Sequence, residues 1–286
     1  MKNLKKLLFV AATTTALFSC SNDDGTPVAN NVTLAFHNTF GDETIVLGDA
    51  TDASATVNTS EAGQIHHFAE AKYVISNIVL VEADGTEFPY NINDLDNGAT
   101  VVNLADATTL TYVLNTIPAA TYTQIQFGLG VRSDLNTLDE VSNPNFYALA
   151  GANDTEMMWE WGTGYRFTKI EGFYGSENET LSVHTGSTVE GTQDEEDTYT
   201  QGVDAYRTIT LDLTTAAIVG NSAPTITIKA DFDKLLSGAT NTITLGEDNA
   251  TPNIHTAASM EQFVDNLGGD GTTDTHGMFT IESVTN

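Results

Sequence analysis

Cysteine and positive charge are what this sequence has least of. Its 286 residues include one cysteine and ten lysines and arginines, against 39 aspartates and glutamates, for a formal charge of −29. A single cysteine excludes disulfides within the chain and zinc sites built from several thiolates. The excess of acidic groups repels nucleic acid and anionic lipid headgroups, so we expect neither as a partner.

Sequence signatures of catalysis and of nucleotide binding are also missing. The chain has no Gly-x-Ser-x-Gly element, no phosphate-binding loop and no His-Glu-x-x-His pair. Each of these motifs positions a nucleophile, a phosphate or a catalytic metal through a fixed spacing. We therefore expect a binding protein and not an enzyme.

The first twenty residues have the composition of an export signal. Lys2, Lys5 and Lys6 precede a mostly apolar run, Leu7–Phe18, which closes at Ser19–Cys20. A basic start, a short apolar run and a small residue before the cut are typical of a secretory signal. The run is shorter than the roughly 20 residues that a membrane-spanning helix needs.

The position of the only cysteine at the end of this run resembles a bacterial lipobox. We expect residues 1–19 to be a lipoprotein signal peptide and Cys20 to be lipidated. The alternative is an ordinary signal peptide, cut nearby, that leaves a free thiol. The polar residues 20–30 are predicted to be a flexible tether and residues 31–286 one domain. A lipid anchor places this domain outside the cytoplasm at the outer membrane, on its periplasmic face or on the cell surface.

Beyond the tether, apolar residues recur with a period of two, and turn residues separate the runs. The alternating segments are Val32–Phe36, Tyr73–Val81, Ile125–Leu129, Tyr206–Leu213, Thr225–Ala230 and Met278–Ile281. The pattern predicts an all-β protein, a single large antiparallel β-sandwich with long polar loops. Ala83–Thr86 is predicted to be a hairpin turn, Thr256–Leu267 a short helix and Asp231–Leu236 one helical turn.

Histidines are the natural candidates for metal binding, because imidazole is a common copper ligand. The six are His37, His66, His67, His184, His255 and His276. His37 follows the first predicted strand, and His184 lies where a strand enters a glycine turn. His66 and His67 are adjacent, so on a strand they would face opposite sides and at most one could join a shared site. Each histidine could equally be an ordinary surface or hydrogen-bonded core residue.

Both tryptophans lie two residues apart in one aromatic segment, Met157–Gly172. On a strand, Trp159 and Trp161 would share a face. Paired indoles commonly stabilise a sandwich core by burial. Met157 and Met158 precede them, and their thioethers suit Cu(I) but also serve simply as packing groups.

The string Met158–Phe167, followed by Lys169–Gly172, resembles the hallmark of the MbnP-like family. These are copper-binding periplasmic or surface proteins that also occur as lipoproteins in Bacteroidetes. Further segments that agree with this family are Phe36–His37, Tyr73–Leu80, Ile117–Val131 and Val183–Gly186.

The resemblance implies a β-sandwich that binds one copper ion through histidines and a tryptophan oxidised to kynurenine by a partner di-haem enzyme. Carried onto this sequence, the histidine candidates are His37 and His184, and the tryptophan candidates are Trp159 and Trp161. An indole nitrogen only donates a hydrogen bond, whereas the amine of kynurenine can bind a metal. The implied role is copper acquisition, storage or delivery.

Two other interpretations stay open. A surface adhesion or glycan-binding module without a metal would use aromatic faces and polar loops. A calcium-stabilised module would use the oxygen-rich loops Asp94–Gly98 and Gly268–Gly271, although neither has the spacing of an EF-hand.

Overall fold

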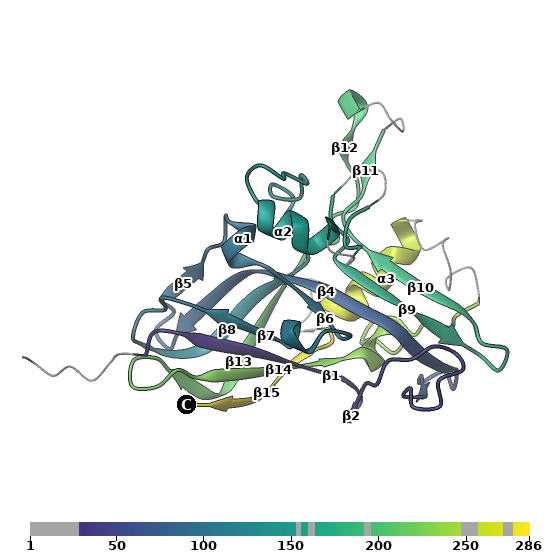
Figure 1. Ribbon diagram of the computed structural model, residues 1–286, viewed down its shortest axis with the longest axis horizontal. Coiled ribbons are helices and arrows are strands. Elements are labelled where there is room, and N and C mark those ends of the chain that lie inside the picture. The colour runs from purple at the N-terminus through teal and green to yellow at the C-terminus, as the bar shows by residue number, and fades with distance from the viewer. Residues whose placement is uncertain (1–28, 153–155, 160–163, 192–195, 247–256, 271–276) are drawn as a thin grey trace, which may run out of the picture.

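The computed structural model describes residues 29–286 apart from residues 153–155, 160–163, 192–195, 247–256 and 271–276. This part of the chain is all-β, with two large sheets and a few short helices (Figure 1), so the predicted fold class is confirmed. Cys20 and the predicted signal peptide lie outside the described residues. No helix among the described residues is long and apolar enough to cross a membrane.

The strands are β1 (Val32–Phe40), β2 (Glu43–Thr44), β3 (Asn58–Thr59), β4 (Ile65–Glu82), β5 (Glu87–Tyr90), β6 (Thr100–Asn103), β7 (Thr111–Leu114), β8 (Thr121–Leu129), β9 (Thr168–Tyr174), β10 (Glu179–Thr185), β11 (Val189–Glu190), β12 (Thr200–Gln201), β13 (Arg207–Ile218), β14 (Thr225–Asp231) and β15 (Phe279–Thr285). The helical elements are α1 (Leu95–Gly98), η1 (Ala107–Leu110), α2 (Pro144–Tyr147), η2 (Ala148–Ala152), η3 (Glu196–Thr198), η4 (Phe232–Leu235) and α3 (Ala257–Gly268). The predicted helix and helical turn correspond to α3 and η4, and the predicted turn joins β4 to β5.

The smaller sheet has the order β15-β14-β1-β2, and β7 also pairs with β1. Its central strand β1 shows why the period of two is so clear in the sequence. Val32, Leu34 and Phe36 are buried, and the residues between them are half-buried. One expectation needs correction: β1 and β14 run parallel, so the sandwich is not purely antiparallel.

The larger sheet has the order β10-β9-β4-β8-β13, with β3, β5 and β6 also paired to β4. The long strand β4 is buried over most of its length because both faces of the sheet are covered there. Tyr73 and Ile75 point into the core between the two sheets, whereas Val74 belongs to a separate apolar cluster on the outer face.

This second cluster determines where a pocket can form. It contains Phe146 of α2 together with Tyr165, Phe167 and Val74. Figure 1 shows α1 and α2 on this side of the larger sheet. Phe146 and Tyr165 meet edge to face, with ring centroids 5.1 Å apart. The aromatic segment thus forms a third layer over part of the sheet, and a pocket lies at the border of that layer.

Candidate metal-binding pocket

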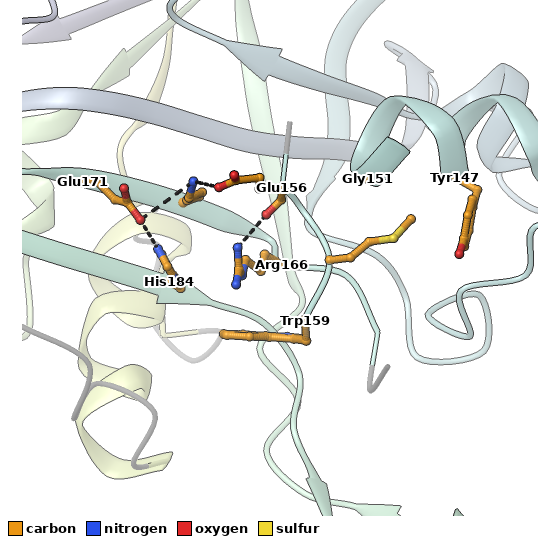
Figure 2. Close-up of a pocket in the computed structure, with 9 residues that line it drawn as sticks. Tyr147, Gly151, Glu156, Trp159, Arg166, Glu171 and His184 are labelled. Atoms are coloured by element: carbon orange, nitrogen blue, oxygen red, sulfur yellow. Dashed lines mark hydrogen bonds and ion pairs between the residues drawn. The ribbon is translucent and has the colours of Figure 1, made fainter. Parts of the chain in front are cut away.

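A pocket of about 570 Å³ opens on the outer face of the larger sheet (Figure 2). It is lined by Tyr147, Gly151, Glu156, Met158, Trp159, Arg166, Lys169, Glu171 and His184. The floor comes from β9 and β10, and the walls come from η2 and the aromatic segment. Residues distant in sequence therefore meet there.

The polar floor follows directly from strand register. His184 on β10 lies beside Lys169 on β9, which lies beside Lys72 on β4. Because Val183 and Ile170 point into the main core, the alternating side chains of His184 and Lys169 must point outward. The next row along carries Ser182, Glu171 and Glu70 in the same order.

Lys169 is the centre of a buried ionic network. Its side chain is 4% exposed, and its Nζ lies 2.9 Å from a carboxylate oxygen of Glu70 and 3.8 Å from one of Glu171. It also donates to Glu156. Burial disfavours the charged ammonium, but the hydrogen bonds to Glu156 and Glu70 outweigh that cost and raise the pKa of Lys169. Lys169 therefore stays charged and holds three carboxylates around it.

His184 is bound to this network through Glu171. The Nε2 atom of His184 lies 2.8 Å from Oε1 of Glu171 and 3.4 Å from the hydroxyl of Ser182. The hydrogen bond from His184 lowers the pKa of Glu171, and the charge of Lys169 adds to the effect against the opposing cost of burial. The carboxylate thus remains ionised next to the imidazole.

Trp159 forms the wall opposite Glu171. Trp159 is 7% exposed, and its ring centroid lies 6.4 Å from that of His184. The guanidinium carbon of Arg166 lies 5.2 Å from the centroid of the indole, a cation–π contact. Gly186 leaves the room the indole needs, since a Cβ atom there would lie 2.7 Å from Nε1 of Trp159.

Trp159 is not on a strand, so the expected sharing of one strand face by the two indoles does not hold for it. The backbone folds back instead: Met158 bridges to Tyr165, and the amide of Trp159 donates to the carbonyl of Gly164. Strand β9 begins only at Thr168. Trp161 lies outside the described residues.

The structure does not bring His37 to this pocket. It lies on the smaller sheet, where its Nδ1 is 3.0 Å from Glu282 and its Nε2 is 2.9 Å from Oγ1 of Thr44. Its neighbour Phe36 points into the main core, so His37 points outward on that sheet. His37 and His184 therefore occupy opposite outer faces of the sandwich, and one ion, bound at about 2 Å by each imidazole, cannot contact both. The expected pairing of these two histidines needs correction.

The other histidines are distributed as the sequence implied. His66 and His67 lie on β4 and face opposite sides. His66 is fully buried between Phe40 and Phe68, and burial lowers its pKa to about 4. His255 and His276 lie outside the described residues. Neither His66 nor His67 lines the pocket.

The pocket is lined by one imidazole, from His184, by the carboxylates of Glu156 and Glu171, and by Met158, whose thioether sulfur lies beside Gly151. Within the described ranges, no three His, Cys, Asp and Glu side chains form a group that could hold a metal ion. A metal bound here would therefore need donors beyond these types, such as sulfur or an amine made from the indole.

Of the residues that line this pocket, Met158, Trp159 and His184 were candidates from the sequence, whereas Glu171, Lys169 and Arg166 were not. Lys169 and Glu171 are two residues apart, as are Ser182 and His184, so on a strand the two members of each pair would share a face; this spacing is the signal that the sequence offers. Only the register of β9 against β10 shows that these pairs are neighbours.

The comparisons with known proteins agree with this architecture. The MbnP family model matches residues 29–257, which include both Trp159 and His184. The chain belongs to the MbnP family. The solved structure of MbnP from Methylosinus trichosporium is similar with a TM-score of 0.51 and 14% sequence identity, over 90% of this chain and 98% of that one. At this identity the similarity concerns the MbnP fold and not the ligands of a site. No curated protein matches the chain.

Proposed function

We propose that this member of the MbnP family binds copper at the pocket formed by Trp159 and His184. One observation carries the proposal: an indole and an imidazole from separate segments meet in a cavity, with ring centroids 6.4 Å apart. Both belong to the motifs on which the family resemblance rests.

The donor chemistry fits copper in part. Imidazole nitrogen and thioether sulfur, from His184 and Met158, suit Cu(I), and imidazole also suits Cu(II). An intact indole of Trp159 offers no lone pair to a metal. Oxidative opening of the indole to kynurenine by a di-haem partner enzyme would supply an amine as a further ligand. Trp161 is the other candidate for this modification.

The proposed role is copper acquisition, storage or delivery and not catalysis. A lipid on Cys20 would anchor the domain to the outer membrane, facing the periplasm or the cell surface. The partners are then a copper ion and the modifying enzyme, with membrane contact through the anchor alone. The strong negative charge would also draw cations towards the domain without binding them specifically.

Copper retention tests the proposal. The protein is purified from cells grown with added copper, and bound metal is measured in wild type, His184→Ala and His37→Ala. Because His37 lies on the opposite face, His37→Ala is the matched control and should keep its copper. In His184→Ala, the affinity for copper should fall by at least tenfold. Equal retention by wild type and His184→Ala would rule out this pocket as the copper site.

The glycan-binding alternative finds less support at this pocket. A sugar would stack on an open aromatic face, but Trp159 is 7% exposed and Arg166 covers one side of its ring. Titrating the protein with copper and, in parallel, with sugars separates the two functions, because only the ligand that belongs to the function of this pocket should bind there.

A further inference from the structure

A second pocket, of about 210 Å³, lies between strands β11 and β12 and the loop that follows β8. These two strands pair as a short antiparallel ribbon, which projects from the rest of the domain (Figure 1). The described residues that line this ribbon pocket are Ser133, Asn136, Ser187, Thr188, Val189, Tyr199, Thr200 and Gln201. The ribbon pocket shares none of them with the pocket around Trp159 and His184.

The ribbon pocket has no charged side chain on its described lining, although the chain has 39 acidic residues. The neighbouring pocket on the same loop differs, because its lining includes Asp94, Asp96, Asp134 and Asp139. A charged ligand needs opposite charge at its site to offset the water that it loses on binding. The ribbon pocket therefore suits a neutral ligand.

The base of the ribbon pocket is fixed by its own hydrogen bonds. The hydroxyl of Thr188 accepts from the amide of Val203 at 2.9 Å, and the hydroxyl of Ser187 accepts from the amide of Ala205 at 3.1 Å. Gly202 lets the two strands approach, since a Cβ atom there would lie 2.5 Å from the Thr188 hydroxyl. A pocket that is formed before binding loses little free energy in ordering its walls.

The remaining polar groups of the lining are able to bond to a ligand. The side chains of Ser133, Thr200 and Gln201 make no hydrogen bond to other residues in the described part of the chain. The Oδ1 atom of Asn136 accepts from the amide of Tyr165 at 2.7 Å, which leaves its Nδ2 to donate. Hydroxyl and amide groups both donate and accept, and the hydroxyls of a sugar do the same.

Tyr199 adds a half-buried aromatic ring to this lining. Gly191 makes room for the ring, because a Cβ atom there would lie 2.9 Å from one of the ring carbons. An aromatic ring can cover the apolar C–H face of a sugar while the sugar hydroxyls keep their hydrogen bonds. Pockets for drug-sized ligands have volumes of roughly 300–1,000 Å³, so this smaller pocket fits about one sugar ring.

We propose that the ribbon pocket binds one ring of a neutral sugar, with Gln201 and Asn136 bonded to its hydroxyls and Tyr199 against its apolar face. This is a second function of the domain and does not depend on copper. A terminal or branching ring of a neutral polysaccharide is a ligand of this kind, so the pocket would attach the domain to a glycan.

The test is a titration of the full-length, ¹⁵N-labelled protein with glucose, galactose, mannose and N-acetylglucosamine, each alone. At least one of these sugars should shift the amide signals of residues 133–136, 187–189 and 199–201 until they saturate. A dissociation constant of about 1 mM is expected, because a single sugar ring offers only about a dozen heavy atoms.

Variants of the lining test the assignment of its residues. Gln201→Ala and Tyr199→Ala should each weaken sugar binding by about fivefold or more. Gln201→Glu keeps the size of the side chain but removes its donor and adds a charge, so it should weaken binding as well. Gln124→Ala is the matched control, because the Gln124 amide bonds to Asp212 on the larger sheet and does not line the ribbon pocket.

The outcomes separate this proposal from copper binding. Absence of saturable shifts with all four sugars would overturn the sugar site, as would shifts centred on Trp159 and His184 instead. Unchanged affinity in both Gln201→Ala and Tyr199→Ala would overturn it too. His184→Ala should keep its sugar binding and Gln201→Ala its copper, so failure of one proposal leaves the other standing.

Discussion

Two regions of the molecule carry nearly the same three side chains. On the larger sheet, His184 lies beside Lys169 in register and bonds to Glu171. On the smaller sheet, His37 lies beside Lys229 in register and bonds to Glu282. Both sets point outward from the sandwich.

The two sets differ in whether another segment covers them. The aromatic segment lies over the first set, and the side chain of Lys169 is 4% exposed, against 21% for Lys229. The second set has no aromatic lining among the described residues, and both ring nitrogens of His37 are engaged by Glu282 and Thr44. The same residue types on a strand thus line a pocket only where another segment of the chain covers them.

The largest expected effect separates the two lysines. Lys169→Met removes the ammonium that Glu70, Glu156 and Glu171 share, although Glu70 keeps Lys72 and Glu171 keeps His184. Because Lys169 itself is buried, we expect the free energy of unfolding to fall by about 3 kcal/mol. Lys229→Met removes an exposed ion pair with Asp42 and should cost less than about 1 kcal/mol. Urea unfolding of both variants measures the difference. Equal losses would show that the cover over Lys169 has no energetic consequence.

A third histidine, His66, sharpens the comparison because it is buried without a carboxylate partner. Its pKa is about 4 in the folded state, against about 6.5 when unfolded. Between these pH values the unfolded chain binds a proton at His66 that the folded protein does not bind. Above about pH 6.5 this residue therefore does not lower the free energy of unfolding, and the free energy of unfolding falls as the pH decreases from 6.5 to about 4. The loss should reach about 3 kcal/mol.

His66→Phe should flatten this dependence when unfolding is measured at several pH values from 7 to 4. His67→Phe, on the other face of β4, is the control and should retain the dependence. An unchanged slope in His66→Phe would mean that other groups titrate in this range.

A smaller effect concerns the indole wall. In Gly186→Ala, the new methyl group would overlap Nε1 of Trp159 and the carbonyl oxygen of Tyr165. We expect a loss of about 1–3 kcal/mol in stability and a red-shifted Trp159 fluorescence, measured in a Trp161→Phe background. Gly151→Ala would meet only the flexible Met158 and should leave the emission unchanged.

The smallest effect is expected at the uncovered histidine. The His37–Glu282 pair is 34% and 41% exposed, so His37→Ala should lower the free energy of unfolding by about 1 kcal/mol or less. A thermal melt gives the change in stability. A loss above about 2 kcal/mol would show that the pair anchors β15 more strongly than its exposure suggests.

Much of the fold could be predicted because burial alternates along the strands. Val32–Phe36 and Thr225–Ala230 have one face in the core, and their sequences show it. The pairing of β1 with β14 could not be predicted, since parallel and antiparallel neighbours need the same alternation. Burial does not alternate along β4, where residues 71–76 and 78–81 are buried without a break because both faces of the sheet are covered.

The residues of the candidate site also divide into those that the sequence could predict and those that it could not. Trp159 and His184 stood out because tryptophan and histidine are rare here and their motifs are recognisable. His37 stood out for equally good local reasons, yet its outward direction on the other sheet removes it from the pocket. Glu171 and Lys169 drew no attention, because charged residues on a strand usually just face water.

The order of apolar and polar residues by itself determined that this chain forms strands, that it is all-β, and which side chains on those strands point away from the core. Tertiary structure alone decided which outward-facing side chains become neighbours, because strand order and register join residues far apart in the chain. It also decided that one histidine–glutamate pair lies beside an indole while the other stays open to water, since only folding brings the aromatic segment over the larger sheet.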